Sequence, residues 1–124
     1  MIWIICLFFI VADAYFNYYR IEVLHNNINH YFNGLYRGVF YLGLVWLYGM
    51  PLLQAAMFLL GAFCLHSILF NLGLNFLRHK PFDYLGKASL LDRLEAKMPW
   101  IVILIWKVIA ASGFIYAFYR TDLL

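Results

Sequence analysis

The stretch that decides the fold is residues 38–77, GVFYLGLVWLYGMPLLQAAMFLLGAFCLHSILFNLGLNFL, which contains no Asp, Glu, Lys or Arg. A helix rises about 1.5 Å per residue and the hydrocarbon layer of a bilayer is about 30 Å thick, so this stretch holds about two spans. Gly49-Met50-Pro51 interrupts it, and proline cannot continue a helix without loss of a hydrogen bond. The stretch therefore predicts a transmembrane helical hairpin.

The composition of the whole chain extends this prediction. Of 124 residues, 66% are hydrophobic and 12% are charged, which lies outside the range of soluble domains. Several long apolar helices in so short a chain would leave too little polar surface to cover them in water. We expect a single domain whose main partner is the lipid bilayer. The net charge of +3 is not gathered into a nucleic-acid-binding motif, so no nucleic acid is expected.

Hydropathy divides the chain into four apolar segments. Residues 2–19 begin the chain, with no basic region or cleavage site of a signal peptide, so we interpret them as a retained span. The second span must begin near Ile28, because Gly38 to Gly49 alone would reach only about 18 Å. The predicted fold class is all-α, an integral membrane four-helix bundle with spans at about 2–19, 28–49, 51–77 and 99–119.

The segment between the third and fourth spans, residues 78–97, is the longest hydrophilic stretch. Ser89 and Asp92 resemble a capping box. Four apolar residues fall on one helical face: Leu90, Leu91, Leu94 and Met98. This pattern predicts a short amphipathic helix lying in the membrane interface.

Basic residues predict the orientation. Seven of them lie in or beside two loops on the same side, whereas the turn at Met50 has none and the tail has Arg120; the seven are Arg20, Arg37, Arg78, Lys80, Lys87, Arg93 and Lys97. By the positive-inside rule, loops 20–37 and 78–97 are cytoplasmic and both termini lie outside, in a multi-pass protein of the cell membrane.

Two charges fall at membrane depth, where charged side chains are costly and usually face a partner. Along the helix axes, Asp13 lies about 18 Å from the outer face of the membrane, where the first span begins. Lys107 lies about 12 Å from the inner face, where the fourth span begins. In a layer of about 30 Å these two depths coincide. We predict an ion pair between Asp13 and Lys107, with Arg37 as the rival partner of Asp13. Its role is either a structural clamp or the handling of protons or ions.

Polar residues also follow helical faces on three of the spans. The predicted intramembrane polar cluster comprises Asp13, Asn17, His30, Asn33, Arg37, Asn71, Asn75 and Lys107. His66 does not share the face of Ser67, Asn71 and Asn75 and is left out of it. The cluster either joins the helices by hydrogen bonds or lines a small cavity.

Neither a metal site nor a cofactor is expected. The four histidines form no HxxxH or HExxH pair, and the serines lack a nucleophile-elbow motif. Cys6 and Cys64 fall inside predicted spans, where we expect apolar packing and no disulfide.

Scattered residues carry a resemblance to a known group. They are Asp13-Ala14, Asn29-His30, Asn33, Arg37, Asn75 with Arg78, Tyr84-Leu85-Gly86 and Leu91-Asp92-Arg93. The chain resembles small uncharacterised integral membrane proteins of phages and prophages. The resemblance implies a small helical membrane protein and transfers no catalytic residue.

The function expected from these patterns is that of a structural or accessory membrane protein within a homo-oligomer or a larger membrane complex. One alternative is a holin-like pore lined by the asparagine-bearing faces. The other is a membrane-embedded lipid-modifying enzyme that uses the region of Asp13, His30 and Arg37.

Overall fold

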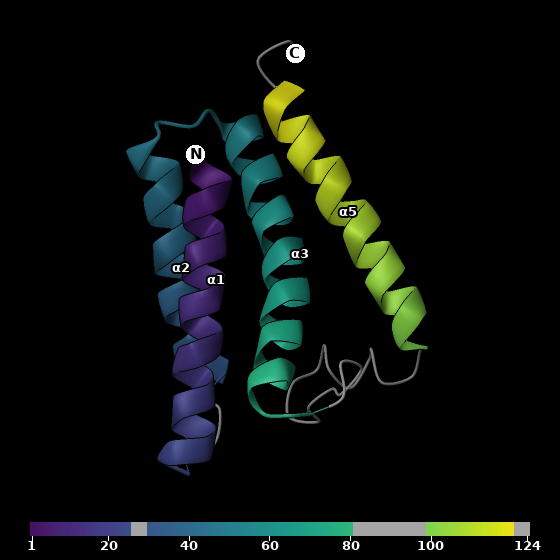
Figure 1. The fold of residues 1–124 in the computed structure, drawn as a ribbon. Helices are drawn as coiled ribbons and strands as arrows, with labels where there is room; N and C mark the ends of the chain where they lie inside the picture. The colour runs from purple at the N-terminus through teal and green to yellow at the C-terminus, as the bar shows by residue number, and fades with distance from the viewer. Residues whose placement is uncertain (26–29, 81–98, 121–124) are drawn as a thin grey trace.

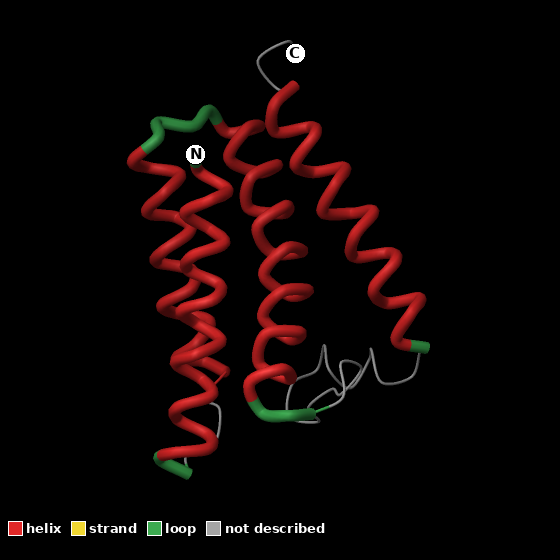
Figure 2. Tube along the Cα trace, in the orientation of Figure 1, coloured by secondary structure: helices red, strands yellow, loops and turns green. Residues whose placement is uncertain are grey.

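The computed structural model describes residues 1–25, 30–80 and 99–120, and this part of the chain is all-helical, as predicted (Figure 2). The helices are α1 (Ile2–Tyr18), the π-helix η1 (Tyr19–Val23), α2 (His30–Leu47), α3 (Leu52–Leu77) and α5 (Trp100–Arg120). The predicted interfacial helix, which carries Ser89 to Met98, lies outside the described residues.

Helix α3 is the centre of the arrangement, because it contacts α1, α2 and α5. In Figure 1, α3 stands between α1 and α5, and α2 lies beside α1. The N-terminus, the turn between α2 and α3, and the end of α5 share one end of the molecule. The ends of η1 and α3 and the start of α5 lie at the other end, which we call the Arg20 end.

The chain reverses at the predicted break. Gly49 has a φ of +58°, a left-handed conformation that glycine adopts without steric cost. The Gly49 N–H donates to the Trp46 carbonyl at 3.1 Å, and the Met50 N–H donates to the Val45 carbonyl at 3.1 Å. These two bonds close α2 with a Schellman motif. Pro51 follows as the N-cap of α3, where it has no helical hydrogen bond to lose.

The first helical segment does not end near Arg20, where the sequence predicted the start of a partly helical loop. It continues through η1 to Val23, and the Leu24 N–H donates to the Tyr19 carbonyl at 3.1 Å. Within η1, two charged residues that are two positions apart have partners from different helices. Glu22 accepts from Arg78 Nε at 2.8 Å, whereas Arg20 turns toward Asn33 of α2.

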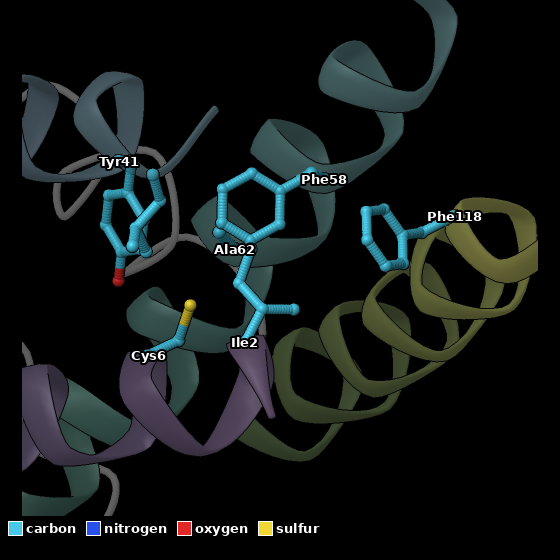
Figure 3. Close-up of a cluster of buried hydrophobic side chains, with 7 residues drawn as sticks. Ile2, Cys6, Tyr41, Phe58, Ala62 and Phe118 are labelled. Carbon is cyan, nitrogen blue, oxygen red and sulfur yellow. The ribbon is translucent and has the colours of Figure 1, made fainter. Parts of the chain in front are cut away.

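Apolar packing fills the end of the molecule near the N-terminus. Figure 3 shows Ile2 and Cys6 of α1, Tyr41 of α2, Phe58 and Ala62 of α3, and Phe118 of α5. Trp3 joins them, with ring centroids 5.3 Å from Phe58 and 5.5 Å from Phe118. All four helices therefore contribute to one cluster at this end.

The outer surface is apolar while polar side chains are buried. Phe8, Trp46 and Leu52 are 74%, 83% and 88% exposed, whereas Asp13 and Asn17 are 3% and 0% exposed. In water this distribution would expose large apolar side chains and desolvate charged ones at the same time. Three helical segments are long and apolar enough to cross a membrane: Ile2–Val23, Leu52–Leu77 and Ile101–Arg120.

Candidate functional site

The most connected polar group of the described chain is the carboxylate of Asp13 on α1. Its Oδ1 accepts hydrogen bonds from the Tyr36 hydroxyl and, at 2.9 Å, from Asn17 Nδ2. Its Oδ2 accepts from Arg37 Nε at 2.6 Å and lies 2.7 Å from His66 Nε2. Donors from α1, α2 and α3 thus converge on one buried group. We call Asp13, Asn17, Tyr36, Arg37 and His66 the Asp13 cluster.

The charge balance of the Asp13 cluster follows from these contacts. Four hydrogen bonds fill the acceptor sites of an ionised carboxylate, and the guanidinium of Arg37 supplies the opposite charge. The Arg37 guanidinium also lies over the Phe70 ring, with Cζ 4.4 Å from the ring centroid. Its Nη2 is buried without a hydrogen-bond partner, which leaves the aromatic face as its contact.

His66 connects Asp13 to a second phenol. Because an ionised carboxylate only accepts, His66 Nε2 carries the hydrogen in this contact. The other ring nitrogen, Nδ1, lies 2.7 Å from the Tyr41 hydroxyl. Phe9 and Phe70 flank the imidazole, with ring centroids at 5.9 and 5.6 Å. The resulting row of carboxylate, imidazole and phenol can fix the ring of His66 and can share a proton along its length.

The hydrogen bonds also extend from Asp13 toward the Arg20 end. Asn33 Nδ2 of α2 donates to Asn17 Oδ1 of α1 at 2.8 Å, and both residues are almost fully buried. Asn33 Oδ1 in turn accepts a long contact of 3.4 Å from Arg20. This amide pair and the contact from Arg20 join α1 and η1 to α2, as interhelical hydrogen bonds do in membrane bundles.

The structure brings together four of the eight residues of the predicted cluster: Asp13, Asn17, Asn33 and Arg37. The predicted ion pair between Asp13 and Lys107 is wrong, and the rival partner Arg37 takes its place. Lys107 Nζ instead donates to Ser67 Oγ of α3 at 2.7 Å. The predicted depths of the two residues coincide, but α3 stands between α1 and α5 (Figure 1). Asp13 contacts His66 of α3 and Lys107 contacts the next residue, Ser67, so the two charged side chains meet different faces of α3.

The remaining predicted residues lie away from the carboxylate. Asn71 is half-buried and Asn75 buried on α3, and neither is a hydrogen-bond partner of Asp13. His30 begins α2, and its side chain is outside the described part.

Sequence reasoning missed His66 and Tyr36, which contact Asp13 directly. His66 was omitted because it does not share a helical face with Ser67 and Asn71. That face turns toward α5, since Ser67 accepts from Lys107, whereas His66 turns toward α1. A histidine within an apolar helix of 26 residues was itself a signal, because such a polar group needs a partner. Tyr36 carried no comparable signal among ten tyrosines.

The described residues contain no group of three His, Cys, Asp or Glu side chains placed to hold a metal ion. Cys6 and Cys64 are buried free thiols. No protein-family model, curated protein or solved structure matches this chain. The contacts of the Asp13 cluster therefore carry the functional argument.

Proposed function

We propose that this chain is a four-span integral membrane protein with a structural or accessory role, in which the Asp13 cluster clamps α1, α2 and α3 together. One observation carries the proposal: hydrogen-bond donors from three helices meet on the carboxylate of Asp13, whose side chain is 0% exposed, inside a molecule with an apolar exterior. In a bilayer such contacts replace the hydration that charged groups would otherwise lose.

Helix α2 is the fourth span in this proposal. Its 18 residues extend about 27 Å, close to the thickness of the hydrocarbon layer. The polar side chains that lower its hydropathy, Asn33 and Arg37, turn toward α1. Its outward face carries apolar residues, among them Leu35, Val39, Leu42 and Trp46. The surface offered to lipid is therefore as apolar as that of the other helices.

The orientation follows from the placement of basic residues, as argued from the sequence. We place both termini and the Met50 turn outside, and the Arg20 end in the cytoplasm. The resemblance to small phage and prophage membrane proteins is in keeping with an accessory role of this kind. The partners would be further copies of the chain or other subunits of a membrane complex.

A holin-like pore receives less support. The amide and charged groups of the Asp13 cluster bond to one another, and Asn17 and Asn33 are 0% and 1% exposed. A pore between copies would be lined by outward faces, and those of α1 and α2 are apolar. Neither the interior of one bundle nor the outward faces of α1 and α2 between copies supply the polar lining that an aqueous pore needs.

Expression in bacteria tests both parts of the proposal. The protein should stay in the membrane fraction after an alkaline carbonate wash, and cells loaded with a potential-sensitive dye should keep their membrane potential. Recovery of detergent-free, monodisperse protein from the aqueous fraction would contradict membrane integration. Depolarisation that rises with expression would favour the pore over the accessory role.

A further inference from the structure

Arg20 lies where a membrane helix meets the lipid headgroups. It follows Ile2, the first residue of α1, by eighteen positions, or about 27 Å along the helix axis. With the start of α1 at one face of a layer of about 30 Å, Arg20 reaches the opposite boundary. Tyrosines at positions 15, 18 and 19 precede it, as is typical of the interfacial aromatic belt.

Two aromatic rings hold the Arg20 guanidinium at the seam between α1 and α2. Its Cζ lies 5.5 Å from the ring centroid of Phe16 and 5.6 Å from that of Phe32. Phe16 is 43% exposed and Phe32 is 47% exposed, so both belong to the outer surface. Arg20 itself is half-buried, so its guanidinium lies at the outer edge of the seam, between these two exposed rings and the buried Asn33.

No carboxylate neutralises this charge within the described part of the chain. Asp13 is paired with Arg37, and Glu22 is paired with Arg78. The hydrogen bond from Arg20 to Asn33 is long, at 3.4 Å, and uses only Nη1. Among the described residues, Arg20 thus has N–H donors without an acceptor and a positive charge without a counter-charge, at the level of the phosphates. A planar guanidinium can bind two phosphate oxygens at once.

We propose that Arg20, flanked by Phe16 and Phe32, is a binding site for the phosphate of an anionic phospholipid in the leaflet at the Arg20 end. The guanidinium donates to the phosphate oxygens, and the two rings contact the glycerol and the upper acyl chain. Arg37 lies one turn or more deeper and is occupied by Asp13, so it takes no part. This inference rests on the membrane assignment, which the carbonate wash tests separately.

Native mass spectrometry of the full chain in a neutral detergent tests the site. The protein, extracted from membranes, is titrated with phosphatidylglycerol, with phosphatidylcholine and with inorganic phosphate. We expect phosphatidylglycerol to bind more tightly than phosphatidylcholine, and Arg20→Gln to weaken it about tenfold, the loss of one charge-assisted contact. Arg120→Gln, which removes one exposed positive charge at the other end, should leave binding unchanged.

Three results would overturn the proposal. Unchanged phosphatidylglycerol binding in Arg20→Gln would remove Arg20 from the site. Displacement of the lipid by inorganic phosphate would assign the site to a free anion. If Arg20→Gln does not fold, Arg20→Lys keeps the charge without the planar fork, and we expect it to bind several-fold more weakly than the native chain. Equal binding by Arg20→Lys would contradict the geometry.

Discussion

At the scale of single residues, the Asp13 cluster depends on an asymmetry between its members. One carboxylate accepts hydrogen bonds from donors on three helices, whereas each of these donors supplies one of the four bonds. Removal of the shared acceptor leaves several buried donors without a partner, and removal of one donor leaves the others in place. Loss of a buried partner costs more free energy than the intact pair contributes.

We therefore expect Asp13→Asn to lower the free energy of unfolding by about 3–5 kcal/mol. An amide has one acceptor oxygen where the carboxylate has two, and it leaves the positive charge of Arg37 without a counter-charge. Thermal unfolding in detergent measures the change. In the double variant with Arg37→Gln, the loss should be smaller than the sum of the single losses, since both changes break the same pair. Additive losses would show that Asp13 and Arg37 are not coupled.

The two phenols of α2 should differ in their contributions. The Tyr36 hydroxyl donates to a charged group, and the Tyr41 hydroxyl shares a hydrogen bond with an imidazole. We expect Tyr36→Phe to cost about 1.5–3 kcal/mol and Tyr41→Phe about 1 kcal/mol in unfolding free energy. Tyr31→Phe is the matched control, since Tyr31 is 93% exposed and should tolerate the change. An equal loss at positions 36 and 41 would contradict this ranking.

At the scale of helices, close approach distinguishes one glycine of α3 from the glycines of α2. A Cβ at Gly61 would lie 3.1 Å from Cη2 of Trp3 and 3.4 Å from Cβ of Phe114, so three helices meet there. A Cβ at Gly34 or Gly38 would meet nothing within 4 Å. Gly34 and Gly38 lie four positions apart on one face of α2, and no other helix of the described chain packs closely on that face.

Replacing Gly61 and replacing Gly34 by alanine should change the free energy of unfolding in opposite directions. Gly61→Ala forces Trp3 to shift and should lower the unfolding free energy by about 1–3 kcal/mol. Gly34→Ala meets open space and should raise it by about 0.5–1 kcal/mol, because alanine loses less backbone entropy in a helix. Both are read from thermal unfolding in the same detergent. A destabilising Gly34→Ala would indicate that another chain packs on that face.

At the scale of the whole molecule, the proposed four-span arrangement predicts which positions share a side of the membrane. Single cysteines are placed at Met50, Arg120, His25 and His79 in a background with Cys6→Ala and Cys64→Ala. A membrane-impermeant maleimide should label Met50→Cys and Arg120→Cys in intact cells, and His25→Cys and His79→Cys only after permeabilisation. The pattern follows because an odd number of spans separates the two groups.

Labelling at Met50 decides whether α2 crosses the bilayer. If α2 lies along the surface instead of crossing the bilayer, Met50→Cys and His25→Cys will label from the same side. Labelling of all four positions with the sides exchanged would keep the four spans and reverse the orientation predicted from the basic residues.

Much of the fold could be predicted from the sequence because hydropathy and helix breakers are local properties. The reversal at Gly49-Met50-Pro51 lies where proline and a positive-φ glycine require it. The continuation of α1 through η1 could not be predicted, since it depends on partners in distant helices, namely Asn33 for Arg20 and Arg78 for Glu22.

The sequence by itself determined that the chain is helical, that long stretches suit lipid, and that Asp13 at membrane depth needs a partner. It did so because composition and depth along a helix are read from one segment at a time. Only the tertiary structure decided that the partners are Arg37 and His66 and not Lys107. That choice depends on how each helix is rotated about its axis and on which helix stands between which others, and these are set by packing across the whole bundle.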